Sequence, residues 1–251
     1  SDRALPVIAV PTTCGTGSEG NGFAVLTNPD TKDKKSLRSP VIVPKASLID
    51  PELMMTMPRG LTATVGFDAL CHNMEAYLAS ARQPLTDMMA LYGISLLAKS
   101  LCAVCGDAPD VSAWEDVTLA STLGGMVINT AGVGAPHSME HPVSGLYDAV
   151  HGLGLAALMP VIVERSWQSA PDRYAGISRL LGGSGAADCA DAIRALLRRL
   201  DIAVTLSQLG AREADIDWLA DNCMKVSAAG MRNHPRQFSV DEIKDLYRLS
   251  L

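Results

Sequence analysis

The sequence predicts a mainly α protein, in which a short β-containing segment, residues 1–50, precedes a helical body, residues 51–251. Three observations support this. The chain is 48% hydrophobic but only 4% aromatic, and its apolar residues, mostly Ala, Leu, Met and Val, favour packed helices over a β-sandwich. The first fifty residues contain short apolar runs of the kind that form buried strands. From Asp50 onward helical signals dominate.

Three segments of the first part are predicted strands: 5–11, 23–27 and 41–43. The first is an apolar run bounded by prolines, and the other two are similarly apolar and short. The polar stretch 28–35 between the second and third is expected to be a turn. Asp50 then caps the first helical segment, with a proline at the first helical position.

Seven segments of the helical body are predicted helices, and the breaks between them carry turn chemistry. These breaks include Gln83-Pro84, the stretch 106–109, the glycine-rich stretch 182–185 and His234-Pro235. A capping box that starts at Ser239 marks the last helix. The predicted helices are 62–80, 85–101, 114–129, 154–169, 186–200, 213–225 and 240–249.

Charge and composition exclude several classes of protein. A net charge of −6 argues against a nucleic-acid surface. We find no apolar run of about 18 residues, so no membrane span is expected. The first residues lack the pattern of a signal peptide. We therefore expect neither a nucleic acid nor a membrane as a partner.

Six cysteines in a chain of 251 residues do not form a disulfide framework, and a reducing cytoplasm is the simpler expectation. Cys102 and Cys105 form a single CxxC motif. Because no second CxxC exists to complete a zinc ribbon, two buried small side chains are the favoured interpretation.

Residues 15–20 match the pattern GxGxxG after a strand-like segment. A dinucleotide fingerprint requires a helix to begin at the third glycine, whereas the residues after Gly20 continue like a strand. We therefore do not expect a Rossmann phosphate loop. The hydroxyls and glycine amides of residues 12–18 suit contact with a phosphate, and an ordinary glycine-rich turn is an equal alternative.

Four of the five histidines lie in two clusters. In the first, Asp68, His72 and Glu75 are spaced i, i+4 and i+7, so they share one face of the predicted helix. A carboxylate and an imidazole four residues apart can bind one ion, and they suit zinc, ferrous iron or another first-row metal. Taken alone, the Asp68–His72 pair is also compatible with a polar pair on a half-exposed helix.

The second cluster holds His137, His141 and His151. The break expected at Pro142 and Gly145 places His137 and His151 on separate segments. Glycines and prolines around the cluster indicate turns that aim side chains into a cleft. Three histidines in fifteen residues, together with the Asp-x-x-x-His helix, predict a divalent metal site.

The remaining candidate residues are less defined. Glu75 and Glu140 are expected either to bond a ligating histidine or to have a surface or helix-stabilising role. His234 lies in a polar loop and is expected to be solvated or to bond locally.

With these residues in view, the chain closely resembles the iron-containing (group III) alcohol dehydrogenase family, almost end to end. Three stretches carry the resemblance: the Thr-Thr-x-Gly-Thr-Gly-Ser-Glu loop at 12–19, and residues 66–72 and 137–152. It implies that residues 51–251 are an all-helical, metal-binding catalytic domain of the dehydroquinate-synthase-like type. Residues 1–50 would be the remnant of an α/β nucleotide-binding domain. Family members carry most of that domain before this start, so the chain is expected to be truncated.

The resemblance also implies roles for individual residues. Four side chains match the metal ligands of the family: Asp68, His72, His137 and His151. His141 matches its non-ligating histidine beside the nicotinamide. Three threonines match the loop that closes on the cofactor: Thr12, Thr13 and Thr16. The implied cofactors are Fe²⁺ or Zn²⁺ and NAD or NADP. The implied partners are a small alcohol or aldehyde and a second copy of the chain.

The implied reaction is the reversible oxidation of an alcohol to an aldehyde or ketone, with His141 as the candidate to relay the proton. Two alternatives stay open. The same ligands allow a metal-dependent hydrolase, in which the ion activates water. The chain is also compatible with a metal-binding module that has no catalysis of its own.

Overall fold

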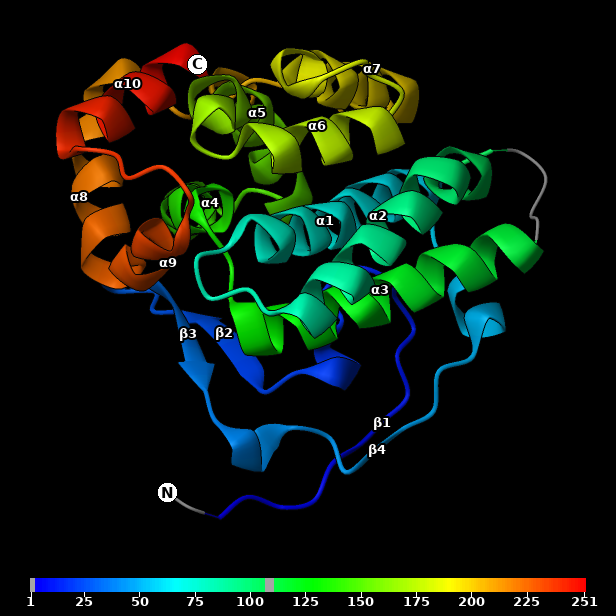
Figure 1. The fold of residues 1–251 in the computed structure, drawn as a ribbon. Coiled ribbons are helices and arrows are strands. Elements are labelled where there is room, and N and C mark those ends of the chain that lie inside the picture. Colours follow the sequence, from blue (N-terminus) through cyan, green and yellow to red (C-terminus); the bar gives the residue numbers. More distant parts are fainter. Residues whose placement is uncertain (1–2, 107–110) are drawn as a thin grey trace.

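The computed structural model describes residues 3–106 and 111–251, and helices dominate it as predicted (Figure 1). Three long helices lie side by side across the middle of the molecule: α1 (Arg59–Leu78), α2 (Pro84–Val104) and α3 (Val111–Ala131). Their predicted counterparts are confirmed to within a few residues at each end. Apart from Gly106, the turn expected at 106–109 lies outside the described residues.

The three long helices share the largest core of the molecule. Phe67, Leu70 and Met74 of α1 are fully buried, and they belong to one cluster with Leu97 and Leu101 of α2. Burying a side chain of this size stabilises the fold by about 1.5–3 kcal/mol. Because α1 is buried along most of its length, the polar side chains that it carries are held in a rigid frame.

Helices α4 (Ala135–Tyr147) and α5 (His151–Ser166) continue from α3. The break expected at Pro142 and Gly145 is wrong, because α4 runs unbroken through both residues. Proline lacks the amide that would bond within the helix, yet α4 is almost entirely buried, so packing outweighs that loss. Gly145 is required by close approach, since a Cβ there would lie 2.3 Å from the backbone oxygen of Lys32. Asp148, the residue after the helix, has a left-handed backbone with φ 55°.

The other five helices cover α1, α4 and α5 (Figure 1). A second core cluster lies among α4, α5, α8 and α10, where the Tyr247 hydroxyl donates to the backbone oxygen of Met139 over 2.7 Å. The predicted helices at 186–200, 213–225 and 240–249 are confirmed, the first two with short 3₁₀ turns at their starts. Helix α4 and two shorter helices, α6 and α9, were not predicted. The bounds are α6 (Pro171–Leu180), α7 (Cys189–Leu200), α8 (Ile216–Val226), α9 (Ala228–Asn233) and α10 (Val240–Leu249).

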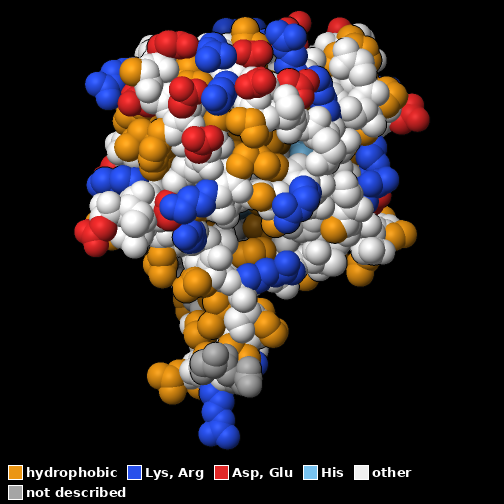
Figure 2. Space-filling view, turned by 90° about the vertical axis from the view of Figure 1, so that its left-hand side faces the viewer, with side chains coloured by type: hydrophobic (Ala, Val, Ile, Leu, Met, Phe, Trp, Pro, Cys, Tyr) orange, Lys and Arg blue, Asp and Glu red, His pale blue; other side chains and the backbone are white. Residues whose placement is uncertain are grey.

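The first part of the chain forms two small sheets. Strand β1 (Ile8–Ala9) pairs in parallel with β4 (Ala46–Ser47), at the end of the molecule opposite α5 and α7 (Figure 1). Strands β2 (Phe23–Thr27) and β3 (Lys34–Arg38) form an antiparallel hairpin. Figure 2 shows hydrophobic side chains on the part that extends from the helical body. In the first part of the chain, Leu5, Ile8 and Leu48 are hydrophobic residues that are mostly exposed.

Two predictions for this part are wrong. Residues 41–43, a predicted strand, instead largely form a 3₁₀ turn at Pro40–Ile42, which the Ser39 side chain caps. The predicted turn 28–35 ends early, because β3 begins at Lys34. Strand β3 is polar and mostly exposed, so it lacks the apolar pattern by which a strand is predicted.

One single helix of the described residues, α2, is long and apolar enough to cross a membrane. Helices α3 and α4, taken together as one span with a bend between them, also meet this criterion of length and hydropathy. Both belong to the packed core, and core helices pass such a test, so this is weak support for a membrane span.

Candidate metal centre

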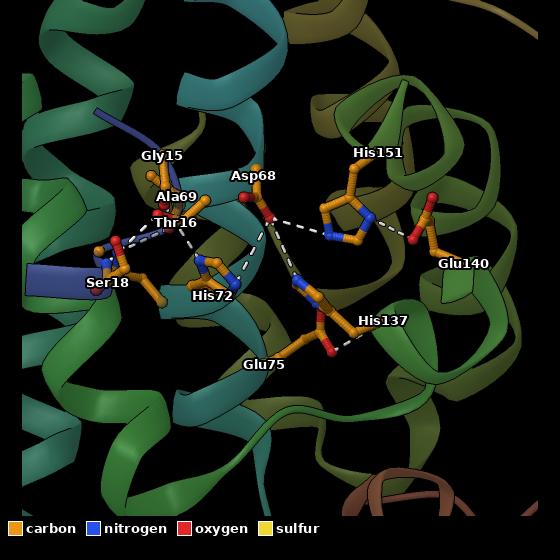
Figure 3. Close-up of polar contacts among 12 residues, drawn as sticks. Gly15, Thr16, Ser18, Asp68, Ala69, His72, Glu75, His137, Glu140 and His151 are labelled. Atoms are coloured by element: carbon orange, nitrogen blue, oxygen red, sulfur yellow. Dashed lines mark hydrogen bonds and ion pairs between the residues drawn. The ribbon is translucent and has the colours of Figure 1, made fainter. Parts of the chain in front are cut away.

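Three imidazoles converge on one carboxylate oxygen (Figure 3). Oδ1 of Asp68 lies 3.6 Å from Nε2 of His72, 3.2 Å from Nε2 of His137 and 3.7 Å from Nε2 of His151. Asp68 and His72 are four residues apart on α1, as the spacing predicts. His137 comes from the first turn of α4, and His151 begins α5. The fold therefore brings all four predicted ligand residues together.

The spacing of these atoms suits one small ion. Ligand atoms about 2.1 Å from an ion in tetrahedral geometry lie about 3.4 Å from one another. The three distances from Asp68 bracket this value. Donor atoms of Asp68, His72 and His137 also lie within 4.8 Å of one another, whereas His151 meets this condition with Glu140 and His141. His151 is thus the open side of the cluster, with 28% of its side chain exposed.

The outer nitrogen of each imidazole has its own acceptor. Nδ1 of His137 lies 2.6 Å from Oε1 of Glu75, Nδ1 of His151 contacts Oε2 of Glu140, and Nδ1 of His72 lies 3.3 Å from the backbone oxygen of Gly15. A proton on Nδ1 satisfies each contact and leaves the Nε2 lone pair free to bind a metal. Of the two alternatives open for Glu75 and Glu140, the structure supports the bond to a histidine in both cases.

The charges of the cluster favour a bound cation. Burial raises the pKa of Asp68, but the surrounding imidazoles outweigh it and hold the pKa below its usual range. Burial lowers the pKa of His137, but Glu75 and Asp68 raise it to about 10. By contrast, burial lowers the pKa of His72 to about 4. A site that keeps one imidazole protonated to balance its carboxylates is one where a divalent ion can replace that proton.

A pocket of about 450 Å³ opens onto this cluster. One end is lined by the four convergent residues and His141, and Phe23, Val25, Ile128 and Val133 form an apolar wall. His141 lies one turn after His137 on α4, and its ring centroid is 5.9 Å from that of His151. Burial lowers the pKa of His141 to about 3, so this imidazole is neutral at pH 7.

Of the three threonines in the loop at 12–19 that are candidate cofactor contacts, only one lines the pocket. Thr16 lines the pocket, and its hydroxyl accepts from the backbone nitrogen of Ser18. Thr12 and Thr13 are exposed earlier in the loop and do not line it. The loop packs tightly on α3, because a Cβ at Gly17 would lie 2.5 Å from the Cα of Gly125. A 3₁₀ turn and then strand β2 follow it, so the expectation that no Rossmann helix begins here is confirmed.

Sequence reasoning missed Lys34. It was placed in a turn, but it belongs to β3, and its Nζ lies 3.4 Å from Nδ1 of His151. Only the pairing of β3 with β2 reveals this position, and no motif marks it.

His234 was expected to be solvated or to bond locally, and this is wrong. It is buried, and its Nε2 lies 3.0 Å from Oγ of Ser166, which is distant in sequence. Cys102 and Cys105 pack in or against the large core and are unpaired, as expected.

Comparisons with known proteins point to one family. A family described as "Fe-containing alcohol dehydrogenase family, C-terminal" matches residues 62–251, and "Iron-containing alcohol dehydrogenase" matches residues 1–51. The chain is 36% identical to 1,3-propanediol dehydrogenase of Klebsiella pneumoniae over 97% of its length and 64% of the relative. It thus spans about 64% of the length of this relative.

Solved structures give the same result. An archaeal alcohol dehydrogenase from a Red Sea brine pool superposes with a TM-score of 0.95 at 32% identity, covering 100% of this chain and 66% of that one. A 1,3-propanediol oxidoreductase superposes with a TM-score of 0.92 at 34% identity, covering 100% of this chain and 67% of that one.

Proposed function

We propose that this chain, which belongs to the iron-containing alcohol dehydrogenase family, holds one divalent metal ion and takes part in NAD(P)-linked, reversible oxidation of an alcohol to an aldehyde or ketone. The observation that carries the proposal is the convergence of three Nε2 atoms on Oδ1 of Asp68. The proposed ligands are Asp68, His72, His137 and His151.

When bound, the ion would supply Lewis-acid chemistry to the substrate hydroxyl, and the nicotinamide would accept the hydride. The protein positions the side chains that would bind the ion. Glu75 and Glu140 hold the rings of His137 and His151 with their Nε2 atoms inward. The apolar wall of the pocket would shield one side of the reacting carbon from water.

His141 is the proposed proton carrier. It lines the pocket beside the ligands, and it is neutral at pH 7 because burial lowers its pKa. From this position it would accept, at a ring nitrogen, the proton that leaves the alcohol in the oxidation direction and pass it to solvent.

The pocket and the relatives favour small alcohols. A volume of about 450 Å³ with an apolar wall suits a short carbon chain. Relatives are named for 1,3-propanediol and for methanol, and the latter is named NAD-dependent. We therefore propose a short alcohol and its aldehyde as the substrate pair, with Thr16 near the cofactor and Thr12 and Thr13 on the approach to it.

The remaining assignments follow from the family and the composition. We propose iron as the ion, with zinc as the alternative, because imidazole and carboxylate ligands suit both. We propose a homodimer in the cytoplasm, and six unpaired cysteines are consistent with a reducing compartment. NAD and NADP are both proposed cofactors.

Two measurements test the proposal. Protein loaded with Fe²⁺ without oxygen, or with Zn²⁺, should retain about one ion per chain by elemental analysis, and Asp68→Asn should retain much less. The loaded protein should oxidise NADH or NADPH when a short aldehyde is added, and metal-free protein should not. Equal metal retention by Asp68→Asn would contradict the proposed centre. Metal retention without cofactor oxidation would instead support a metal-binding module without catalysis.

A further inference from the structure

A second group of ligand-type side chains lies directly beside the proposed centre. Glu140, His141 and His151 each offer an atom, and these atoms lie within 4.8 Å of one another. One carboxylate and two imidazoles would by themselves make a three-ligand site for a transition metal. His151 belongs to both groups, because its Nε2 faces Asp68 and its Nδ1 faces Glu140 (Figure 3).

The ammonium group of Lys34 lies beside this second group. Nζ of Lys34 lies 3.6 Å from Oε2 of Glu140 and 3.4 Å from Nδ1 of His151. The Glu140 side chain is fully buried, and only 16% of the Lys34 side chain is exposed. An ammonium carries three donors and no lone pair, so it can occupy a cation site but cannot serve as a metal ligand.

We propose that Glu140, His141 and His151 form a latent second metal site, and that the ammonium of Lys34 keeps it closed, so that the centre holds one ion. The proposal rests on the proposed function, because it requires an ion at Asp68. Lys34 would thus set the number of metal ions that each chain binds. The latent site would bind a divalent transition metal such as Zn²⁺ or Co²⁺.

Charge balance supports this arrangement. Asp68, Glu75 and Glu140 are three buried carboxylates around the two groups. One divalent ion and the Lys34 ammonium together neutralise them. A second divalent ion added to this set would leave uncompensated positive charge in a buried site, which is strongly unfavourable.

Removal of the Lys34 charge changes the net charge of the buried site from neutral to negative. With one ion bound, one buried negative charge is then left over. A second divalent ion at Nδ1 of His151 would replace the proton that the contact with Glu140 assigns to this nitrogen, and that proton would leave to solvent. The gain of two positive charges and the loss of one proton restore neutrality.

The test is the number of ions per chain. Wild type, Lys34→Met, Lys34→Gln and Lys34→Arg are dialysed against micromolar Zn²⁺ or Co²⁺, and bound metal is counted by elemental analysis and by the end point of the visible Co²⁺ spectrum. Wild type and Lys34→Arg should bind one ion, and the two neutral variants should bind two. Adding Glu140→Gln to Lys34→Met should return the count to one.

The chain offers a matched control in the next residue of the same strand. Lys35 is 54% exposed and pairs with Asp33, so Lys35→Met should still bind one ion. Circular dichroism and thermal melting check that each variant folds, and Lys34→Gln stands in if Lys34→Met does not. A single ion in a folded neutral variant, or two in wild type, would overturn the inference. No ion in any protein would instead overturn the proposed centre itself.

Discussion

At the scale of single residues, Glu75 serves two purposes at once. Its Oε1 contacts Nδ1 of His137 at 2.6 Å, and its Oε2 accepts from the backbone nitrogen of Gly134 over 2.7 Å. The carboxylate therefore orients a proposed ligand and also stabilises the start of α4, where unpaired amides favour negative charge. This double contact ties α1 to α4 at the metal centre.

Replacing Glu75 tests its link to the metal. Glu75→Gln keeps the shape but weakens the bond to His137, so we expect metal affinity to fall by about 10–100-fold. Competition with a chromogenic chelator measures this fall. Glu164→Gln is the control, because Glu164 is half exposed and pairs with Arg194. Equal affinities in the two variants would show that Glu75 does not act on the centre.

His141 is expected to act on protons and not on metal retention. His141→Ala should lower kcat by about 10²-fold, since a positioned acid–base group contributes about that much. Metal content, measured on the same samples, should stay at the wild-type level. Loss of the ion in this variant would identify His141 as a ligand instead.

At the scale of elements, the β2–β3 hairpin is held against α4 by close backbone contact. Gly145→Ala should destabilise the protein by about 1–3 kcal/mol, because its Cβ would lie 2.3 Å from the Lys32 backbone oxygen. Chemical denaturation measures the change. Gly60→Ala is the matched control: nothing lies within 4 Å of its Cβ, so its stability should be unchanged or slightly higher. Equal stability of both variants would contradict the close contact.

The same hairpin is fastened to α8 by Asp33, whose carboxylate contacts Asn222 and Lys225. Lys225 is the main cause that lowers the pKa of Asp33 from 3.8 to about 2. Because the pKa is lower in the folded state, the ionised carboxylate adds to the stability of the fold at pH values above the unfolded pKa of 3.8. This added stability is lost as the pH falls toward 2.

Asp33→Asn should therefore be less stable than wild type at pH 7, and the difference should shrink at pH 3. Urea denaturation of both proteins at the two pH values measures it. A difference that stays constant with pH would show that the carboxylate charge is not responsible.

At the scale of the whole molecule, the proposed ion joins α1, α4 and α5. Binding to the folded state alone would stabilise it by about 4 kcal/mol when free metal is about a thousand times Kd. For a chain of this size that corresponds to a rise in Tm of about 10 °C. Thermal melting with metal and with a chelator measures the shift. Asp68→Asn should melt at the same temperature in both conditions.

Much of the fold and the site was predictable because their signals are local. The i, i+4 spacing of Asp68 and His72 places both on one face of any helix, and α1 has them there. Apolar segments between turn residues located seven of the helices. Helices α6 and α9 were missed because they are short, and α4 because Pro142 and Gly145 indicated a break within it. Strand β3 was missed because its residues are polar and exposed.

The sequence by itself determined which side chains can bind a metal, since residue type and helical spacing are properties of the local chain. Only the tertiary structure decided that α4 runs through Pro142, that His234 is buried, and that Lys34 stands beside His151. Each of these depends on contacts between residues far apart in sequence. The gain from packing α4 outweighs the local preference of proline, and the pairing of β2 with β3 carries Lys34 to a site that no pattern around it indicates.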